Sequence, residues 1–204
     1  MLPDLNLSTE QFFGYSVGIK NGRVVIGSPG DDSYGNDVGL AYVYDYSGGP
    51  WNKKSNISAS VYVGNGGDYF GSSVSVDKAY VAVGAPKIKI GVNEKAGAVY
   101  VFRRSGDFDG ELFRTESTRE KDYFGQAVSV KGTYLLVGAP RDGVGAAYIY
   151  KRNAAGSWIE QKKLIPSRET HGNPYFGNSV SIDGSTAVVG MPYGNWGKGV
   201  VYIY

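Results

Sequence analysis

Four pairs of phenylalanine and glycine recur along the chain, and each is followed at a constant distance by a Gly-x-Pro triplet. The two glycines of each copy are 13 residues apart, and successive Phe-Gly pairs lie 57, 54 and 52 residues apart. A period near 50 residues is typical of repeat arrays and propellers, in which one repeat cannot bury its own core. The pairs are Phe13-Gly14, Phe70-Gly71, Phe124-Gly125 and Phe176-Gly177, and the triplets are Gly27-Ser28-Pro29, Gly84-Ala85-Pro86, Gly138-Ala139-Pro140 and Gly190-Met191-Pro192.

Each copy has the pattern of an antiparallel sheet. The first copy alternates apolar and polar residues up to Asn21-Gly22, a strong signal for a two-residue hairpin turn. The strand after the turn is almost wholly apolar and ends at Gly-x-Pro, because proline cannot donate to a sheet. The corresponding turns are Asp77-Lys78, Lys131-Gly132 and Asp183-Gly184; third strands are expected at 39–44, 97–102, 145–150 and 199–204, and more polar outer strands at 51–63, 108–115 and 158–165.

At these motifs the chain resembles the FG-GAP repeat family, which builds the β-propeller head of integrin α chains. The resemblance implies an all-β fold, a β-propeller of four four-stranded blades forming one domain over residues 1–204. Such propellers serve adhesion, sugar binding and enzyme accessory roles, so the resemblance predicts the fold but not the ligand. The four repeats are expected at about 11–63, 68–115, 122–165 and 174–204, with an N-terminal strand at 2–8.

The fourth copy ends at Tyr204 without an outer strand, whereas residues 2–8 have a strand pattern and no sheet of their own. We therefore expect the N-terminal strand to complete the last blade and cover its open edge. The family usually closes with seven blades, which leaves three alternatives. Four blades close alone, the N-terminal strand pairs with another copy of the chain in a homo-oligomer, or the chain is part of a longer protein.

Composition argues against several partners. The net charge of +2 and the scattered 20% of charged residues give no basic block for nucleic acid. No apolar stretch approaches the 18 residues of a membrane span. The absence of cysteine removes disulfides and thiolate metal sites. Asn6 and Asn56 begin Asn-x-Ser sequons and are candidate glycosylation sites in a secreted protein.

No cofactor is predicted. Many members of the family bind Ca²⁺ through Asp-rich loops between the first two strands of a blade, but these turns hold at most one acid here, Asp77 or Asp183. The candidate ligands for calcium are Asp31, Asp32 and Asp37, in the one acid-rich segment outside these turns. Aspartates in such a segment more often form turns.

Enzymatic activity is not expected. The single histidine, His171, lies in a polar loop, and no nucleophile motif surrounds it. Carboxylates from different blades could still meet in space without leaving a local pattern.

The remaining candidate site is a surface. In the family, the loops after the second strand and before the first strand of each blade share one face, which binds partners in integrins. Exposed Trp, Tyr and Arg residues in loops are typical anchors for proteins or sugar rings. Alternatively, Tyr34 and Trp196 cover the ends of blades. The Tyr and Phe residues of the Phe-Gly motifs are predicted to be core. The implied face carries Tyr34, Asn36, Lys87, Lys89, Arg141, Asp142, His171, Asn173, Tyr193, Asn195 and Trp196.

The sequence therefore predicts a non-catalytic module, extracellular or on a cell surface, that binds a protein or glycan in adhesion. The alternative is a structural subunit that pairs edge strands with its own copies to make a larger propeller, ring or filament.

Overall fold

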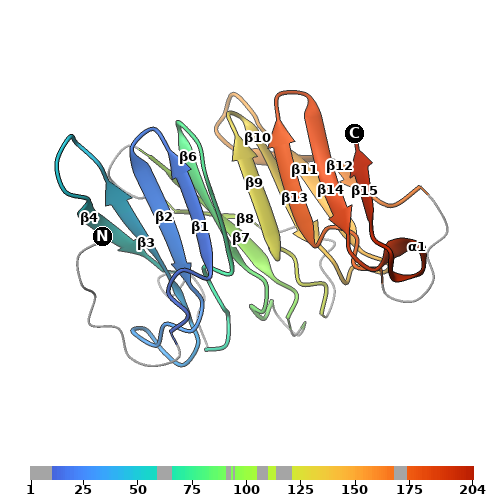
Figure 1. Cartoon of the computed structure of the whole chain (residues 1–204), viewed down its shortest axis with the longest axis horizontal. Coiled ribbons are helices and arrows are strands. Elements are labelled where there is room, and N and C mark those ends of the chain that lie inside the picture. Colours follow the sequence, from blue (N-terminus) through green and yellow to red (C-terminus); the bar gives the residue numbers. More distant parts are fainter. Residues whose placement is uncertain are drawn as a thin grey trace.

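The computed structural model describes residues 11–58, 66–90, 93, 95–104, 110–113, 121–167 and 174–204. They form four antiparallel sheets in sequence order, the blades of a β-propeller (Figure 1). Blade 1 contains β1 (Ser16–Lys20), β2 (Arg23–Ser28), β3 (Leu40–Asp45) and β4 (Asn52–Ile57). Blade 2 contains β5 (Ser73–Val76), β6 (Tyr80–Ala85), β7 (Ala98–Arg103) and β8 (Gly110–Phe113). Blade 3 contains β9 (Ala127–Lys131), β10 (Tyr134–Ala139), β11 (Ala146–Arg152) and β12 (Trp158–Leu164).

Blade 4 contains β13 (Ser179–Asp183), β14 (Thr186–Met191) and β15 (Val200–Ile203), with the short helix α1 (Gly194–Gly197) between the last two. Its expected fourth strand, residues 2–8, lies outside the described residues. Within the described ranges α1 is the only helix, and at four residues it is too short to cross a membrane.

The predicted hairpins are confirmed. Lys20 pairs with Arg23 across the first turn, where Asn21 and Gly22 have φ of 48° and 71°. Positive φ at both positions is what a type I′ turn requires, and it explains the choice of Asn-Gly. The strands of each blade pair in sequence order, and the second strand always ends at the middle residue of the Gly-x-Pro triplet.

The core lies between blades and is built around the motif phenylalanines. Phe70, Phe124 and Phe176 are fully buried. Each packs edge-to-face against two aromatic residues in or directly after the third strand of its own blade, an arrangement worth about 1 kcal/mol per pair beyond burial. The ring centroids lie 5.4 and 6.3 Å apart for Phe70 with Tyr100 and Phe102, 5.5 and 6.2 Å for Phe124 with Tyr148 and Tyr150, and 5.3 and 6.4 Å for Phe176 with Tyr202 and Tyr204.

The blades stand in a row. The first strand of each blade contacts the first strand of the next, from β1 through β5 and β9 to β13. Blade 1 lies at one end of the row and blade 4 at the other (Figure 1). Closure of four blades through residues 2–8 therefore stays a prediction.

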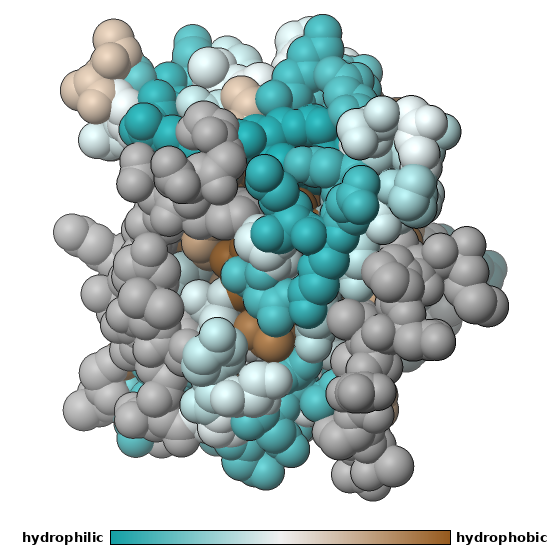
Figure 2. Space-filling model, turned by 90° about the vertical axis from the view of Figure 1, so that its left-hand side faces the viewer, coloured by the Kyte–Doolittle hydropathy of each residue, from teal (hydrophilic) through white to brown (hydrophobic). Residues whose placement is uncertain are grey.

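The outer strand of blade 1 is polar, as expected of a strand half in water. Most of β4 is exposed, including Lys53 and Lys54, and only Ile57 is buried. Seen from this side, the described surface is largely hydrophilic, with small hydrophobic areas (Figure 2). Lysines on an edge strand disfavour pairing with another strand.

Candidate functional site

Two faces of the row differ in how they are built. The loop face consists of the connections between the second and third strands of each blade, together with the residue just before each Phe-Gly pair. The turn face, on the opposite side, holds the tight turns after the first strands. In Figure 1 the loop face is the lower side, where α1 lies. The described residues of these connections are 30–38, 87–90, 93, 95, 141–144 and 193–198.

The tyrosines of the Phe-Gly motifs lie on the loop face, which corrects the prediction that they are core. Tyr69, Tyr123 and Tyr175 have left-handed backbones with φ of 57°, 56° and 56°. Each side chain is half-buried while the following phenylalanine is fully buried. Non-glycine residues rarely adopt this conformation, and such positions often mark functional sites.

Each of these tyrosines meets the residue that follows Gly-x-Pro in the same blade. Lys87 Nζ lies 3.3 Å from the ring centroid of Tyr69. Arg141 Cζ lies 4.9 Å from the centroid of Tyr123. The backbone repeats the arrangement, since the N–H groups of Lys87 and Arg141 donate to the carbonyls of Asp68 and Asp122. A cation over a tyrosine ring contributes about 0.5–1 kcal/mol at exposed sites.

Blades 3 and 4 join these contacts into a continuous row. Arg141 Cζ also lies 5.5 Å from the Tyr175 centroid, so the guanidinium contacts rings from two blades. Tyr175 in turn contacts Tyr193, with centroids 5.6 Å apart. We call Tyr123, Arg141, Tyr175 and Tyr193 the aromatic row. It offers flat rings and one cation, which suit stacking and polar contacts with a partner.

Trp196 extends the loop face beyond the aromatic row. It lies in α1, is 78% exposed, and has φ of 60°, next to Asn195 with φ of 50°. A left-handed backbone at a non-glycine residue costs on the order of 1–3 kcal/mol of conformational strain. Because this strained backbone holds the Trp196 ring at the surface, Trp196 is a candidate anchor for a binding partner. Tyr193 and Tyr34 are also exposed, as are Asn36 and Lys89. His171 and Asn173 lie outside the described residues.

The acid-rich segment of blade 1 forms local structure. The Asp31 carboxylate is buried and accepts hydrogen bonds from the Tyr42 hydroxyl at 2.6 Å and the Ser33 N–H at 2.9 Å. Burial and this hydrogen bond raise the pKa of Tyr42. Asp32 accepts the N–H of Asp37 at 2.7 Å. Within the part of the chain that the structure describes, no cluster of acids or histidine is able to hold a metal ion. The expectation of no cofactor stays a prediction.

Blade 3 repeats the contact of Asp31 and thereby explains Asp142. The Tyr148 hydroxyl donates to Asp142, as the Tyr42 hydroxyl does to Asp31, and Asp142 also pairs with Lys163. Asp142 is thus engaged within its own blade and is not a free carboxylate of the loop face. Asn56, a candidate glycosylation site, is exposed in β4.

Asp68 is a further buried acid near the loop face, since it directly precedes Tyr69. Asp68 is 3% exposed, and its Oδ2 has no hydrogen-bond partner among the described residues. Burial raises the pKa of Asp68 to about 6. Burial, and after it the Asp37 carboxylate, raise the pKa of the adjacent Tyr69.

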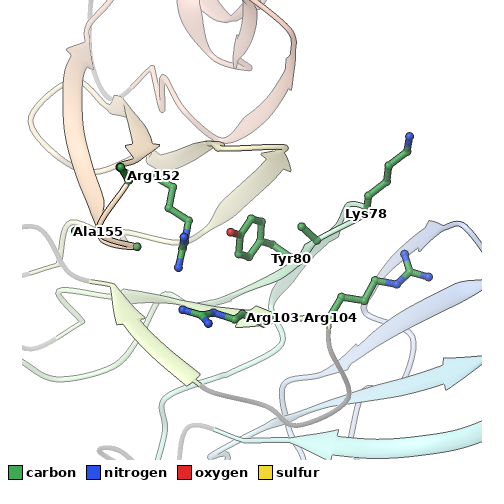
Figure 3. A pocket seen from close by; sticks show the side chains of 9 residues that line it. Lys78, Tyr80, Arg103, Arg104, Arg152 and Ala155 are labelled. Carbon is green, nitrogen blue, oxygen red and sulfur yellow. The ribbon is translucent and has the colours of Figure 1, made fainter.

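The turn face holds an open pocket of about 740 Å³ that the sequence did not predict. The described residues lining it are four cations, Tyr80 and small residues, with no carboxylate. In Figure 3, Arg103 and Arg152 extend toward the space beside Tyr80, whereas Lys78 and Arg104 point away. Arg152 Cζ lies 5.4 Å from the Tyr80 centroid. The only signal in the sequence is the basic end of the third strand in blades 2 and 3.

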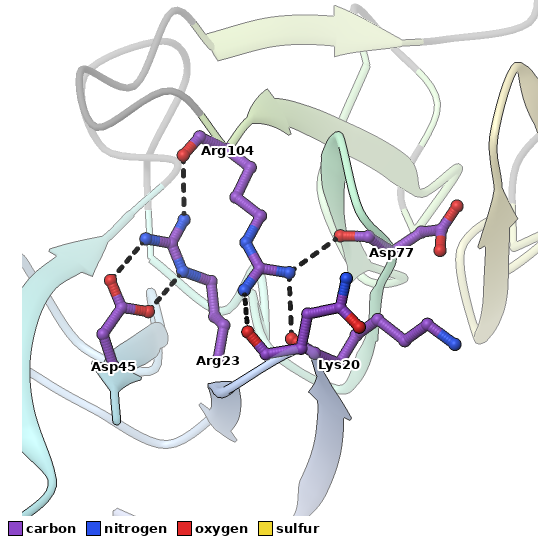
Figure 4. A network of polar contacts seen from close by, with 6 residues as sticks. Lys20, Arg23, Asp45, Asp77 and Arg104 are labelled. Carbon is purple, nitrogen blue, oxygen red and sulfur yellow. Dashed lines mark hydrogen bonds and ion pairs between the residues drawn. The ribbon is translucent and has the colours of Figure 1, made fainter. Parts of the chain in front are cut away.

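Arg104 is held by the junction of blades 1 and 2. It donates to the carbonyls of Asn21 at 2.7 Å and Lys20 at 2.9 Å, and to that of Asp77 at 3.3 Å (Figure 4). Beside it, the guanidinium of the buried Arg23 forms a bidentate salt bridge with the Asp45 carboxylate, with N···O distances of 2.7 and 2.6 Å. The guanidinium of Arg23 lowers the pKa of Asp45. These arginines stabilise the junction of two blades.

Comparison with known proteins identifies the repeats. The model of the FG-GAP repeat matches residues 6–44, 51–102, 117–150 and 158–204. Integrin alpha-PS5 of Drosophila melanogaster is 30% identical over 197 residues, and integrin alpha-PS3 of the same organism is 32% identical over 170 residues. These alignments cover 82% and 72% of this chain but only 18% and 15% of the relatives. The chain thus spans less than a fifth of the length of these relatives.

A solved structure titled as a thermostable family-43 glycoside hydrolase matches with a TM-score of 0.48 and 17% identity, covering 92% of this chain and 69% of that one. This match contradicts the prediction that the chain is not an enzyme, and we withdraw that prediction. The prediction rested on local motifs, but side chains from different propeller blades can come together in space without forming a local motif. At this similarity the match assigns no activity to the chain.

Proposed function

Because the chain belongs to the FG-GAP repeat family, we propose that it is a binding module that recognises a partner through its loop face. The observation that carries the proposal is Trp196, a tryptophan 78% exposed on left-handed backbone. A tryptophan side chain is seldom this exposed to solvent unless it takes part in binding. Tryptophan is also among the residues most enriched at the centres of protein interfaces.

The aromatic row supports the same face. Arg141 is positioned by Tyr123 and Tyr175, so its side chain loses little further freedom when a partner binds. The relatives are integrin α chains, which favours a protein partner and a place outside the cell or on its surface. A glycan that stacks on Tyr193 or Trp196 is the alternative ligand, and a role in adhesion belongs to the same proposal.

The test is binding of the purified chain to a panel of extracellular-matrix proteins and to a glycan array. We expect Trp196→Ala and Arg141→Ala each to weaken the strongest interaction at least tenfold, because truncating an interface anchor costs about 2 kcal/mol or more. Arg103→Ala, on the turn face, is the matched control and should bind as the wild type does. The melting temperatures of all three variants should stay close to that of the wild type.

The panel also separates the ligand classes, since a protein partner gives signal only on the matrix proteins and a glycan only on the array. Unchanged binding by both loop-face variants would rule the proposal out. So would an equal loss in Arg103→Ala.

A further inference from the structure

The three junctions between successive blades use the same contacts. At each one, the Gly-x-Pro glycine of one blade meets the carbonyl of the Phe-Gly glycine of the next. A Cβ on Gly27, Gly84 or Gly138 would lie 1.9, 2.0 or 1.9 Å from the oxygen of Gly71, Gly125 or Gly177. Only glycine permits so close an approach. The serine hydroxyls of Ser16 and Ser73 donate to the first two of these oxygens, at 2.7 and 2.8 Å.

The same junctions bury complementary apolar faces. We call the outward side of each first strand the head face and the facing side of the second and third strands of the preceding blade the tail face. At the third junction, Leu136, Ala147 and Ile149 of blade 3 form the tail face, and Val180 and Ile182 of blade 4 form the head face. At the second junction, Ala82, Val99 and Val101 pack against Val128 and Val130.

Blade 1 carries a head face that no other described blade covers. Val17 and Ile19 occupy the positions of the buried Val128 and Val130 in blade 3, yet each is 68% exposed. Gly14, the glycine of the first Phe-Gly pair, has no atom within 4 Å of a Cβ built on it, whereas the other three Phe-Gly glycines touch the preceding blade.

Blade 4 carries a tail face that is likewise uncovered within the described part of the chain. Val201 and Ile203 occupy the positions of Ala147 and Ile149, and they are 64% and 73% exposed. Beside them is a groove of about 410 Å³, lined in part by Ser179, Gly190, Met191 and Val200.

This groove matches the place where a Phe-Gly pair sits at the internal junctions. Gly71 contacts Gly27, Ser28 and Leu40 of blade 1, and the corresponding residues of blade 4 are Gly190, Met191 and Val200. Ser179 corresponds to Ser16 and Ser73, which donate to the incoming glycine carbonyl. Ser181 corresponds to Ser75 and Ser129, whose hydroxyls accept the N–H groups of Val130 and Ile182 from the next blade.

We propose that blade 4 of one copy of this chain receives blade 1 of a second copy, with Phe13-Gly14 in the groove and Val17 and Ile19 on Val201 and Ile203. The same chain carries both halves of a junction that it forms three times internally, so a second copy supplies a matched partner. At this contact the Gly14 carbonyl accepts from Ser179, and the N–H of Ile19 donates to Ser181. Two such contacts between two copies close a ring, and one contact per copy repeated without closure gives a filament.

This contact differs from edge-strand pairing. It joins sheet faces rather than backbone edges, and it is heterologous, because head meets tail. The lysines of β4 disfavour pairing along that outer edge, whereas the head and tail faces carry apolar side chains and no lysine among the residues that define them.

The test uses light scattering of the whole chain at several concentrations. We expect a mass at least twice that of the 21.9 kDa monomer. A head variant, Val17→Lys with Ile19→Lys, and a tail variant, Val201→Lys with Ile203→Lys, should each be monomeric, with self-association weakened at least tenfold. Mixing the two variants should restore a 1:1 complex that grows no further, because each supplies the face that the other lacks.

Ile159→Lys is the matched control, since Ile159 is 47% exposed in β12 and belongs to neither face. It should associate as the wild type does, and restoration on mixing shows that both double variants are folded. A wild-type chain that stays monomeric would overturn the proposal and indicate that a further repeat or another segment covers these faces. Double variants that still self-associate, or that fail to combine when mixed, would overturn it as well.

Discussion

At the scale of single residues, Asp68 makes the stability of the protein depend on pH. Its carboxyl is buried, and burial raises its pKa from 3.8 to about 6. The folded chain therefore binds this proton more tightly than the unfolded chain does. The contribution of Asp68 to the free energy of unfolding consequently falls as pH rises from about 4 to about 6, and it is constant above that range.

Asp68→Asn removes this charge while keeping the size of the side chain. We expect the variant to be more stable than the wild type by about 2 kcal/mol at a pH of about 7.5 and nearly equal to it at a pH of about 4. Urea unfolding at the two pH values measures the difference. An advantage of Asp68→Asn that is the same at both pH values would show that burial does not perturb the carboxyl.

At the scale of the structural elements, the Gly-x-Pro glycine sets how closely two blades approach. A Cβ on Gly138 would lie 1.9 Å from the carbonyl oxygen of Gly177 in the next blade, and neither backbone can move without disturbing its sheet. We expect Gly138→Ala to lower the free energy of unfolding by about 3 kcal/mol, as overpacking of a dense contact does. Gly49→Ala is the control, because its Cβ would have no atom within 4 Å.

Chemical denaturation of both variants makes the comparison. Equal stability of Gly138→Ala and Gly49→Ala would mean that the junction is looser than the structure shows.

The sequence predicted the elements well because they depend on local signals. Asn21-Gly22 and the Gly-x-Pro triplets place turns and strand ends through backbone preferences of the residues themselves. The outer strands were also found, since β12 (Trp158–Leu164) agrees with the expected 158–165. Such signals need no knowledge of other blades.

Parts of the loop face could not be predicted, for a reason visible in Tyr123. Its recurrence before Phe-Gly is what a core residue would show, and only its left-handed backbone turns the ring toward Arg141. Exposed residues at the ends of the row are a second case. Val17 and Val128 have the same sequence context, but Val128 is buried against blade 2 whereas Val17 is exposed. Arg104 contacts Lys20, 84 residues away, and leaves no local pattern.

At the scale of the whole molecule, the repeats give three distinct surfaces. The loop face carries the aromatic row and Trp196, the turn face carries the basic pocket and the Arg23 and Arg104 contacts, and the two ends carry the head and tail faces. Use of the ends for assembly leaves the loop face free, so assembly and binding can occur together. A ring or filament of copies would then present several loop faces at once, which raises avidity without any new contact.

Hydrogen–deuterium exchange of the chain, with and without its strongest binder from the panel, tests most directly whether the loop face is the recognition surface. The account predicts slower exchange on binding at residues 30–38, 87–90, 141–144 and 193–198, and unchanged exchange at the turns 20–23, 131–134 and 183–186. Slower exchange confined to those turns, with the loop face unchanged, would contradict it.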